Sequence, residues 1–132
     1  MTTHALRLTS PPDDVNRVHV FLEEIWEVSS VEPMDRFRFE TALIELASNV
    51  LRHAAGGQLI NCTMTIKVSN GDLAAELIDD GQAGDIELDT AMPDEFAESG
   101  RGIPLIRALV DTVDYSRCEG SNRWIIAKRL GA

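Results

Sequence analysis

The stretch that decides the fold is Phe39-Glu-Thr-Ala-Leu-Ile-Glu-Leu-Ala-Ser-Asn-Val-Leu-Arg-His-Ala-Ala-Gly56. A row of polar residues, Glu45, Asn49 and His53, recurs along it at four-residue spacing. The row overlaps one edge of the apolar face, with Glu45 furthest out, so it either faces solvent or borders a groove between this helix and a neighbour. The apolar face itself has the three- and four-residue spacing of an α-helix and consists of Phe39, Leu43, Leu46, Ala47, Val50 and Ala54.

The composition is that of an acidic globular protein. The 132 residues are 44% hydrophobic and 26% charged, with a formal net charge of -10, and this length suits one domain with one core. Such a charge repels nucleic acid and anionic membranes, so neither is expected as a partner. The absence of a spanning apolar run or a signal-peptide pattern predicts a cytoplasmic protein. Cys62 and Cys118 lack metal-ligand spacing and are expected to be reduced residues in or near the core.

The remaining periodicities predict a two-layer α/β sandwich over residues 1–132. Alternating residues on either side of Asn70-Gly71 are typical of a hairpin, and Asp35 is a plausible N-cap for the central helix. We expect three helices on one face of a mixed, mostly antiparallel sheet of about five strands. The expected elements, in order, are strand 3–8, helix 13–28, the central helix, strands 58–68 and 72–78, helix 105–110, and strands 111–119 and 123–130.

The polar residues of the central helix could take part in metal binding or catalysis. Asn49 can offer a neutral oxygen to a metal ion. Glu45 can act as a general base if a hydroxyl group is held near it. His53, near the helix end, is expected to have a mainly structural role there.

A second candidate piece is Asp79-Asp80-Gly81, which follows a predicted strand. A carboxylate at that position can accept a hydrogen bond from an exocyclic amine, such as that of adenine. Gly81 would let a ligand approach the backbone closely. The alternative is an ordinary turn, in which Asp-Gly is common.

A third candidate piece is Gly100-Arg101-Gly102, which leads into a helix. Backbone N–H groups at a helix start favour a phosphate group, and Arg101 could add positive charge. The alternative is a loop end with a glycine-assisted helix entry. The acidic segment 82–99 that precedes it is long for a connection in a compact domain, and we interpret it as a lid-like loop.

Together, the three pieces resemble a known family. The order Glu45-x-x-x-Asn49-x-x-x-His53-Ala54, Asp79-x-Gly81 and Gly100-x-Gly102-Ile103 resembles the GHKL, or Bergerat-fold, ATP-binding domain of gyrases and histidine kinases. Two segments further resemble its branch of anti-sigma-factor serine kinases and switch kinases: Ser99-Gly-Arg-Gly-Ile-Pro-Leu-Ile-Arg-Ala-Leu-Val110 and Gly120-Ser-Asn-Arg-Trp124.

The resemblance implies a role for each matching residue. It implies that Asn49 holds Mg²⁺ against the phosphates of ATP or ADP and that Glu45 activates the hydroxyl of a partner serine. It implies that Asp79 binds the adenine amino group while Gly81 lets the base lie close. The implied phosphate end comprises Gly100, Arg101, Gly102 and Ile103. The chain departs from the family where Ala83 replaces a usual glycine, with Gly84 one position later.

Three functions remain open from the sequence. The first is an ATP-dependent protein-serine kinase that acts as an anti-sigma factor and phosphorylates a small STAS-type antagonist. Its partners would be a sigma factor or a regulatory phosphatase, and related kinases often form homodimers. The second is a nucleotide-dependent binding module without kinase activity. The third is an interaction domain without a nucleotide site.

Overall fold

The computed structural model describes residues 1–10, 15–55, 60–81 and 102–131. The eight elements follow the expected order of strand, two helices, hairpin, helix and hairpin. They are β1 (Thr2–Ser10), α1 (Asn16–Glu27), α2 (Pro33–Ala55), β2 (Ile60–Val68), β3 (Asp72–Asp79), α3 (Gly102–Leu109), β4 (Thr112–Cys118) and β5 (Ser121–Arg129).

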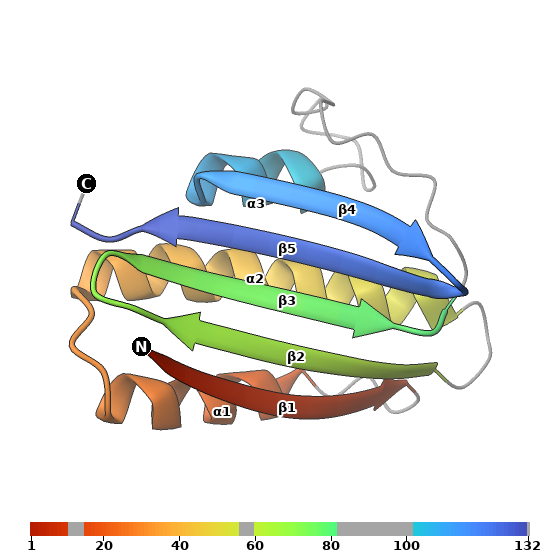
Figure 1. Cartoon of the computed structure of the whole chain (residues 1–132), viewed down its shortest axis with the longest axis horizontal. Helices are drawn as coiled ribbons and strands as arrows, with labels where there is room; N and C mark the ends of the chain where they lie inside the picture. Colours follow the sequence, from red (N-terminus) through yellow and green to blue (C-terminus); the bar gives the residue numbers. More distant parts are fainter. Residues whose placement is uncertain (11–14, 56–59, 82–101, 132) are drawn as a thin grey trace.

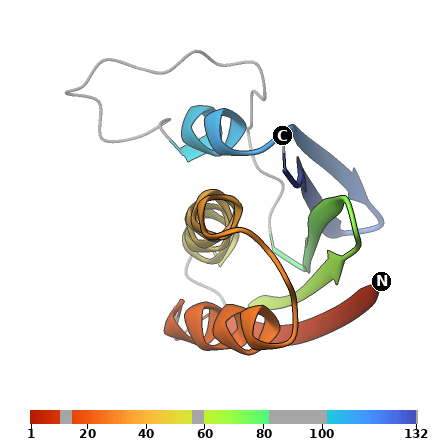
Figure 2. The same cartoon turned by 90° about the vertical axis from the view of Figure 1, so that its left-hand side faces the viewer.

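The strands form one five-stranded sheet in the order β1-β2-β3-β5-β4. Each pair of neighbouring strands is antiparallel, so the described sheet has no parallel member. All three described helices lie on the same face of this sheet (Figures 1 and 2). The expected α/β sandwich is therefore confirmed. None of these described helices combines the length and apolar character needed to cross a bilayer.

The core lies between α2 and the sheet, as the periodicities predict. Phe39, Leu43 and Leu46 on α2 are fully buried. Strand β2 alternates buried and exposed side chains along most of its length, because successive residues of a strand point to opposite faces. Each large aliphatic side chain removed from water in this way contributes roughly 1.5–3 kcal/mol to folding. The opposite face of the sheet carries no described helix (Figure 2).

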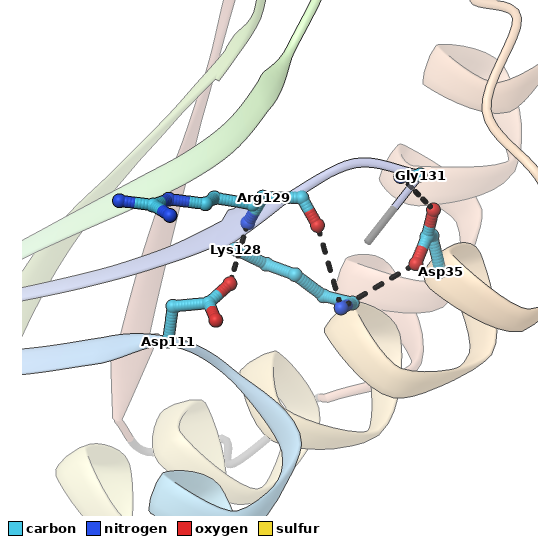
Figure 3. A network of polar contacts seen from close by, with 5 residues as sticks. All are labelled: Asp35, Asp111, Lys128, Arg129 and Gly131. Atoms are coloured by element: carbon cyan, nitrogen blue, oxygen red, sulfur yellow. Dashed lines mark hydrogen bonds and ion pairs between the residues drawn. The ribbon is translucent and has the colours of Figure 1, made fainter.

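The start of α2 differs from the expectation. The helix begins at Pro33, so Asp35 lies inside the first turn and is not the N-cap. Proline is favoured at this first position. The Asp35 carboxylate instead accepts a hydrogen bond from the backbone N–H of Gly131 at 3.0 Å and pairs with Lys128 Nζ at 3.4 Å (Figure 3). Both charged side chains are about nine-tenths buried.

The two cysteines occupy different environments. Cys62 is buried on the helix side of β2, as expected. Cys118 is exposed, which corrects the expectation that it lies in or near the core. The half-buried residues of β4 are Val113 and Tyr115. Cys118 has the opposite parity and therefore falls on the uncovered face of this edge strand.

Candidate functional site

One row of residues crosses the whole sheet at the end of β3. The strand register places Leu8 opposite Cys62, Cys62 opposite Asp79, Asp79 opposite Asn122, and Asn122 opposite Arg117. Directly opposed residues of paired strands share a face and lie within contact of one another. The row therefore passes from an apolar half on β1 and β2 to a polar half on β3, β5 and β4.

Asp79 is the most buried polar residue of this row, with 1% of its surface exposed. Its Oδ1 accepts hydrogen bonds from the N–H of Gly81 and from Nδ2 of Asn122, both at 2.9 Å. Its Oδ2 is also buried but has no hydrogen-bond partner among the described residues. A buried carboxylate oxygen without a donor is costly, so this atom is an acceptor that the described residues leave unsatisfied.

The surroundings of Asp79 act on its pKa in both directions. Burial raises the pKa above the ordinary value of 3.8, because the charged form loses solvation. The hydrogen bonds from Asn122 and Gly81 lower the pKa. The charge of Asp80 raises the pKa and that of Arg117 lowers it, and the net effect is a raised pKa.

The neighbouring carboxylate, Asp80, joins the ends of two strands. Asp80 accepts hydrogen bonds from the backbone N–H of Asn61 at 2.7 Å and from Asn61 Nδ2 at 3.2 Å. These bonds lower the pKa of Asp80. The backbone N–H of Asp80 in turn donates to the carbonyl of Asn61 at 3.2 Å. Asp80 therefore closes the ends of β2 and β3 together and leaves Asp79 as the carboxylate with an open acceptor.

Three polar residues of the site were not predicted from the sequence: Tyr115, Arg117 and Asn122. Asn122 is 2% exposed, and its Oδ1 accepts from Tyr115 Oη at 2.6 Å and from Arg117 Nη1 at 3.0 Å. Arg117 Nη1 also donates to the carbonyl of Gly81 at 2.9 Å. The sequence around Asn122 indicates a turn and carries part of the family resemblance, but it gives Asn122 itself no role in the site. No local signal relates it to Asp79, 43 positions earlier.

The polar row of α2 lies toward the same end of the sheet. Helix α2 starts beside Lys128 and Gly131, near the beginning of β3. It runs alongside β3, so its C-terminal half lies behind the end that carries Asp79 (Figure 1). Glu45 and Asn49 are half-buried on this half of the helix, which is less exposure than a purely solvated face would have. The side chain of His53 lies outside the described residues.

The expected phosphate end is described in part. Helix α3 begins at Gly102, and Ile103 is half-buried in its first turn. The helix starts three residues earlier than expected because Pro104 fits a first turn without losing a helical hydrogen bond. Helix α3 packs against α2. Gly84, Gly100, Arg101 and the lid-like segment 82–99 lie outside the described residues.

Residues 8–128 match the family model of the histidine kinase-like ATPase domain. The chain belongs to this family. The resemblance to the GHKL superfamily is thereby confirmed, and the antiparallel sheet with helices on one face agrees with it. No curated protein sequence matches the chain.

Two solved structures have a similar fold. One contains the RsbU and RsbW domains of a protein from Mycobacterium tuberculosis, with a TM-score of 0.70 and 16% identity over 98% of this chain and 33% of that chain. The other is the catalytic domain of the histidine kinase ThkA, with a TM-score of 0.57 and 16% identity over 98% of this chain and 97% of that chain. This chain thus spans a third of the first structure and nearly all of the second.

Proposed function

We propose that this chain binds ATP with Mg²⁺ and acts as a protein-serine kinase in a partner-switching regulator. The single observation that carries the nucleotide site is the buried Oδ2 of Asp79, which has no donor among the described residues. The exocyclic amine of adenine supplies an N–H donor of the kind that this oxygen requires. Gly81, held by its own N–H bond to Asp79, presents no side chain to an approaching base.

The residues for the phosphate end fit the same ligand. The Asn49 side-chain oxygen is a hard, neutral ligand of the type that Mg²⁺ accepts alongside phosphate oxygens and water. Helix α3 begins at Gly102, and the first N–H groups of a helix have no partner within the helix, which suits them to a phosphate. A chain with net charge -10 needs such local compensation to hold a triphosphate.

Glu45 is the proposed general base. It lies one helical turn before Asn49 on α2, so both side chains project toward the same side of the helix. Bound Mg²⁺ would neutralise charge on the phosphates, and Glu45 would accept the proton of the attacking serine hydroxyl. The chain's own contribution is therefore positioning of the nucleotide and removal of one proton.

The proposed protein partners follow from the anti-sigma-factor branch that the sequence resembles. We propose a STAS-type antagonist as the phosphorylated protein and a sigma factor or regulatory phosphatase as the regulated one. The similarity to a structure that contains an RsbW domain supports this branch. The second candidate function is a nucleotide-dependent binding module without transfer activity, which Ala83 in place of a usual glycine favours.

Nucleotide binding is tested by titrating ATP and Mg²⁺ while following tryptophan fluorescence. Trp124 is buried on β5, two residues from Asn122, so a bound base should change its emission. Replacing Asp79 by Asn should weaken ATP binding roughly 100-fold, because the charged acceptor is lost. Asp72→Asn, at the exposed opposite end of β3, is the matched control and should bind like wild type. Equal ATP affinity in Asp79→Asn would contradict the site.

The transfer step is tested separately with labelled ATP and a STAS-type protein from the same cell. Glu45→Gln should bind ATP normally and lose phosphorylation of the partner serine by at least about 100-fold. Glu40→Gln is the control on the same helix, where the carboxylate pairs with His19 at 3.7 Å. If wild-type protein transfers no phosphate and Glu45→Gln still regulates its target, the binding-module alternative is correct.

A further inference from the structure

The polar half of the row forms a directed chain of hydrogen bonds across three strands. Arg117 on β4 donates to Oδ1 of Asn122 on β5, and Nδ2 of Asn122 donates to Oδ1 of Asp79 on β3. Tyr115, also on β4, adds a second donor to Oδ1 of Asn122. Arg117 also donates to the carbonyl of Gly81, where the turn after β3 begins.

The amide of Asn122 can have only one orientation in this arrangement. Its oxygen side meets the guanidinium of Arg117, which is only a donor. Its nitrogen side meets the carboxylate of Asp79 at 2.9 Å and the carbonyl of Gly81 at 3.4 Å, which are acceptors. A flipped amide would set donor against donor and acceptor against acceptor. Arg117 on one side, and the acceptors of Asp79 and Gly81 on the other, therefore fix which atom of Asn122 faces Asp79. Tyr115 adds a donor to the same oxygen of Asn122.

The fixed amide in turn determines what Asp79 can offer a ligand. Two donors, from Asn122 and Gly81, occupy Oδ1, so the rotation of the carboxylate is set and Oδ2 is the remaining acceptor. The same amide hydrogen bond, together with the nearby guanidinium of Arg117, favours the ionised form of Asp79.

We propose that Arg117, Tyr115 and Asn122 are specificity-determining residues that hold Asp79 as a hydrogen-bond acceptor and thereby select a 6-aminopurine over a 6-oxopurine nucleotide. The inference rests on the proposed nucleotide site and assigns it a source of base selectivity. An ionised Oδ2 accepts the N–H of a 6-amino group but repels the carbonyl oxygen of a 6-oxo group. A carboxylate that turns, or that gains a proton, loses this discrimination.

Arg117 and Arg123 provide a matched pair of variants for the test. Arg117 is exposed, so Arg117→Met removes the first donor of the chain without opening the core. Arg123 lies next to Asn122 in the sequence but on the uncovered face, where it pairs with Glu76 at 2.6 Å. Arg123→Met therefore removes the same charge from the same end of the sheet and leaves the hydrogen-bond chain intact.

The experiment compares the Kd values of ATP and inosine triphosphate, both with Mg²⁺, which differ in the 6-substituent and the N1 proton. Wild type and Arg123→Met should prefer ATP to the same extent. Arg117→Met should lower this preference about tenfold, since the charged donor to Asn122 and to the Gly81 carbonyl is lost. Arg117→Lys, which restores a cationic donor, should recover part of the preference. Melting temperatures should be alike for the two methionine variants, which separates selectivity from stability.

The outcomes are distinct from those of the proposed function. If wild type binds neither nucleotide, the proposed function fails and this inference fails with it. If wild type prefers ATP and Arg117→Met keeps that preference unchanged, only the inference is overturned. The same holds if Arg123→Met loses the preference to the same extent, because the effect would then be one of general surface charge.

Discussion

The sheet has a buried aspartate near each of its two ends, and the two carboxylates are treated differently. Asp35, at the beginning of α2, has a partner for each oxygen: Lys128 Nζ for one and the N–H of Gly131 for the other (Figure 3). The hydrogen bond from Gly131 and the pairing with Lys128 lower the pKa of Asp35, although burial opposes them. Asp79, at the end of β3, has one oxygen satisfied and one without a described donor, and its pKa is raised.

The difference separates a structural end from the proposed binding end. At the Asp35 end, Lys128 and the backbone N–H of Gly131 give both carboxylate oxygens a partner. These contacts attach α2 to the end of β5. At the Asp79 end, the cation Arg117 donates to Asn122 and to the Gly81 carbonyl, and these two residues in turn donate to the carboxylate. A buried carboxylate whose two oxygens both have partners within the chain stabilises the fold. A buried carboxylate with one unpartnered oxygen lowers stability until a ligand supplies the donor.

Removing the charged partner of Asp35 should have the largest effect on stability. Lys128→Met removes the cation and leaves the buried Asp35 carboxylate without one of its two described partners, so we expect a loss of about 3 kcal/mol in the free energy of unfolding. Urea denaturation measures it. Lys67→Met, on an exposed position of β2, is the control and should change little.

The pH dependence provides a second check on the Asp35 end. Because the folded-state pKa of Asp35 is below 3.8, its contribution is present above that pH and is lost as the pH falls through the folded value. Unchanged stability of Lys128→Met at neutral pH would show that the two ends do not differ as argued.

Removing the charge of Asp79 should change the free energy of unfolding by less, and in the opposite direction. Asp79→Asn removes the buried charge, and we expect the free energy of unfolding to rise by about 1 kcal/mol at neutral pH. The raised pKa of Asp79 means that the folded state takes up the proton more readily than the unfolded state. Wild-type stability from this group therefore falls as the pH rises from 3.8 through the folded pKa.

The stability difference between Asp79→Asn and wild type should therefore grow as the pH rises through this range. Denaturation curves recorded at about pH 4 and about pH 8 would measure it. A variant less stable than wild type at the higher pH would show that Asp79 is not the strained carboxylate of the pair. The same variant is expected to lose ATP binding, so gain of stability and loss of function would occur together.

The smallest effect is expected on the uncovered face of the sheet. Arg123 Nε and Glu76 Oε2 are 2.6 Å apart, but their side chains are 51% and 31% exposed. Water screens such pairs, so Glu76→Gln should change the free energy of unfolding by less than about 0.5 kcal/mol. A change comparable to that of Lys128→Met would mean that burial does not separate the structural carboxylate from a surface one.

Part of the candidate site was predictable because its residues carry local signals. Glu45 and Asn49 stand out by their four-residue spacing on a helix, and Asp79 and Gly81 by their place after an alternating strand. Asn122 and Arg117 carry no such signal. The segment around Asn122 indicates a turn and a family resemblance, but nothing in it places Asn122 beside Asp79. The expected cap at Asp35 was wrong for a related reason: its partners come from the far end of the chain.

The sequence by itself determined the helices, the strands and the buried faces. These depend on the periodic spacing of apolar residues, whose side chains leave water on folding. The sequence also determined the family, through motifs that are each only a few residues long. Only the tertiary structure decided which carboxylate is complete and which is open. That decision depends on strand register, which brings Arg117, Asn122 and Asp79 into one row. Register is a long-range property, set when β3 and β5 pair across 43 residues of chain.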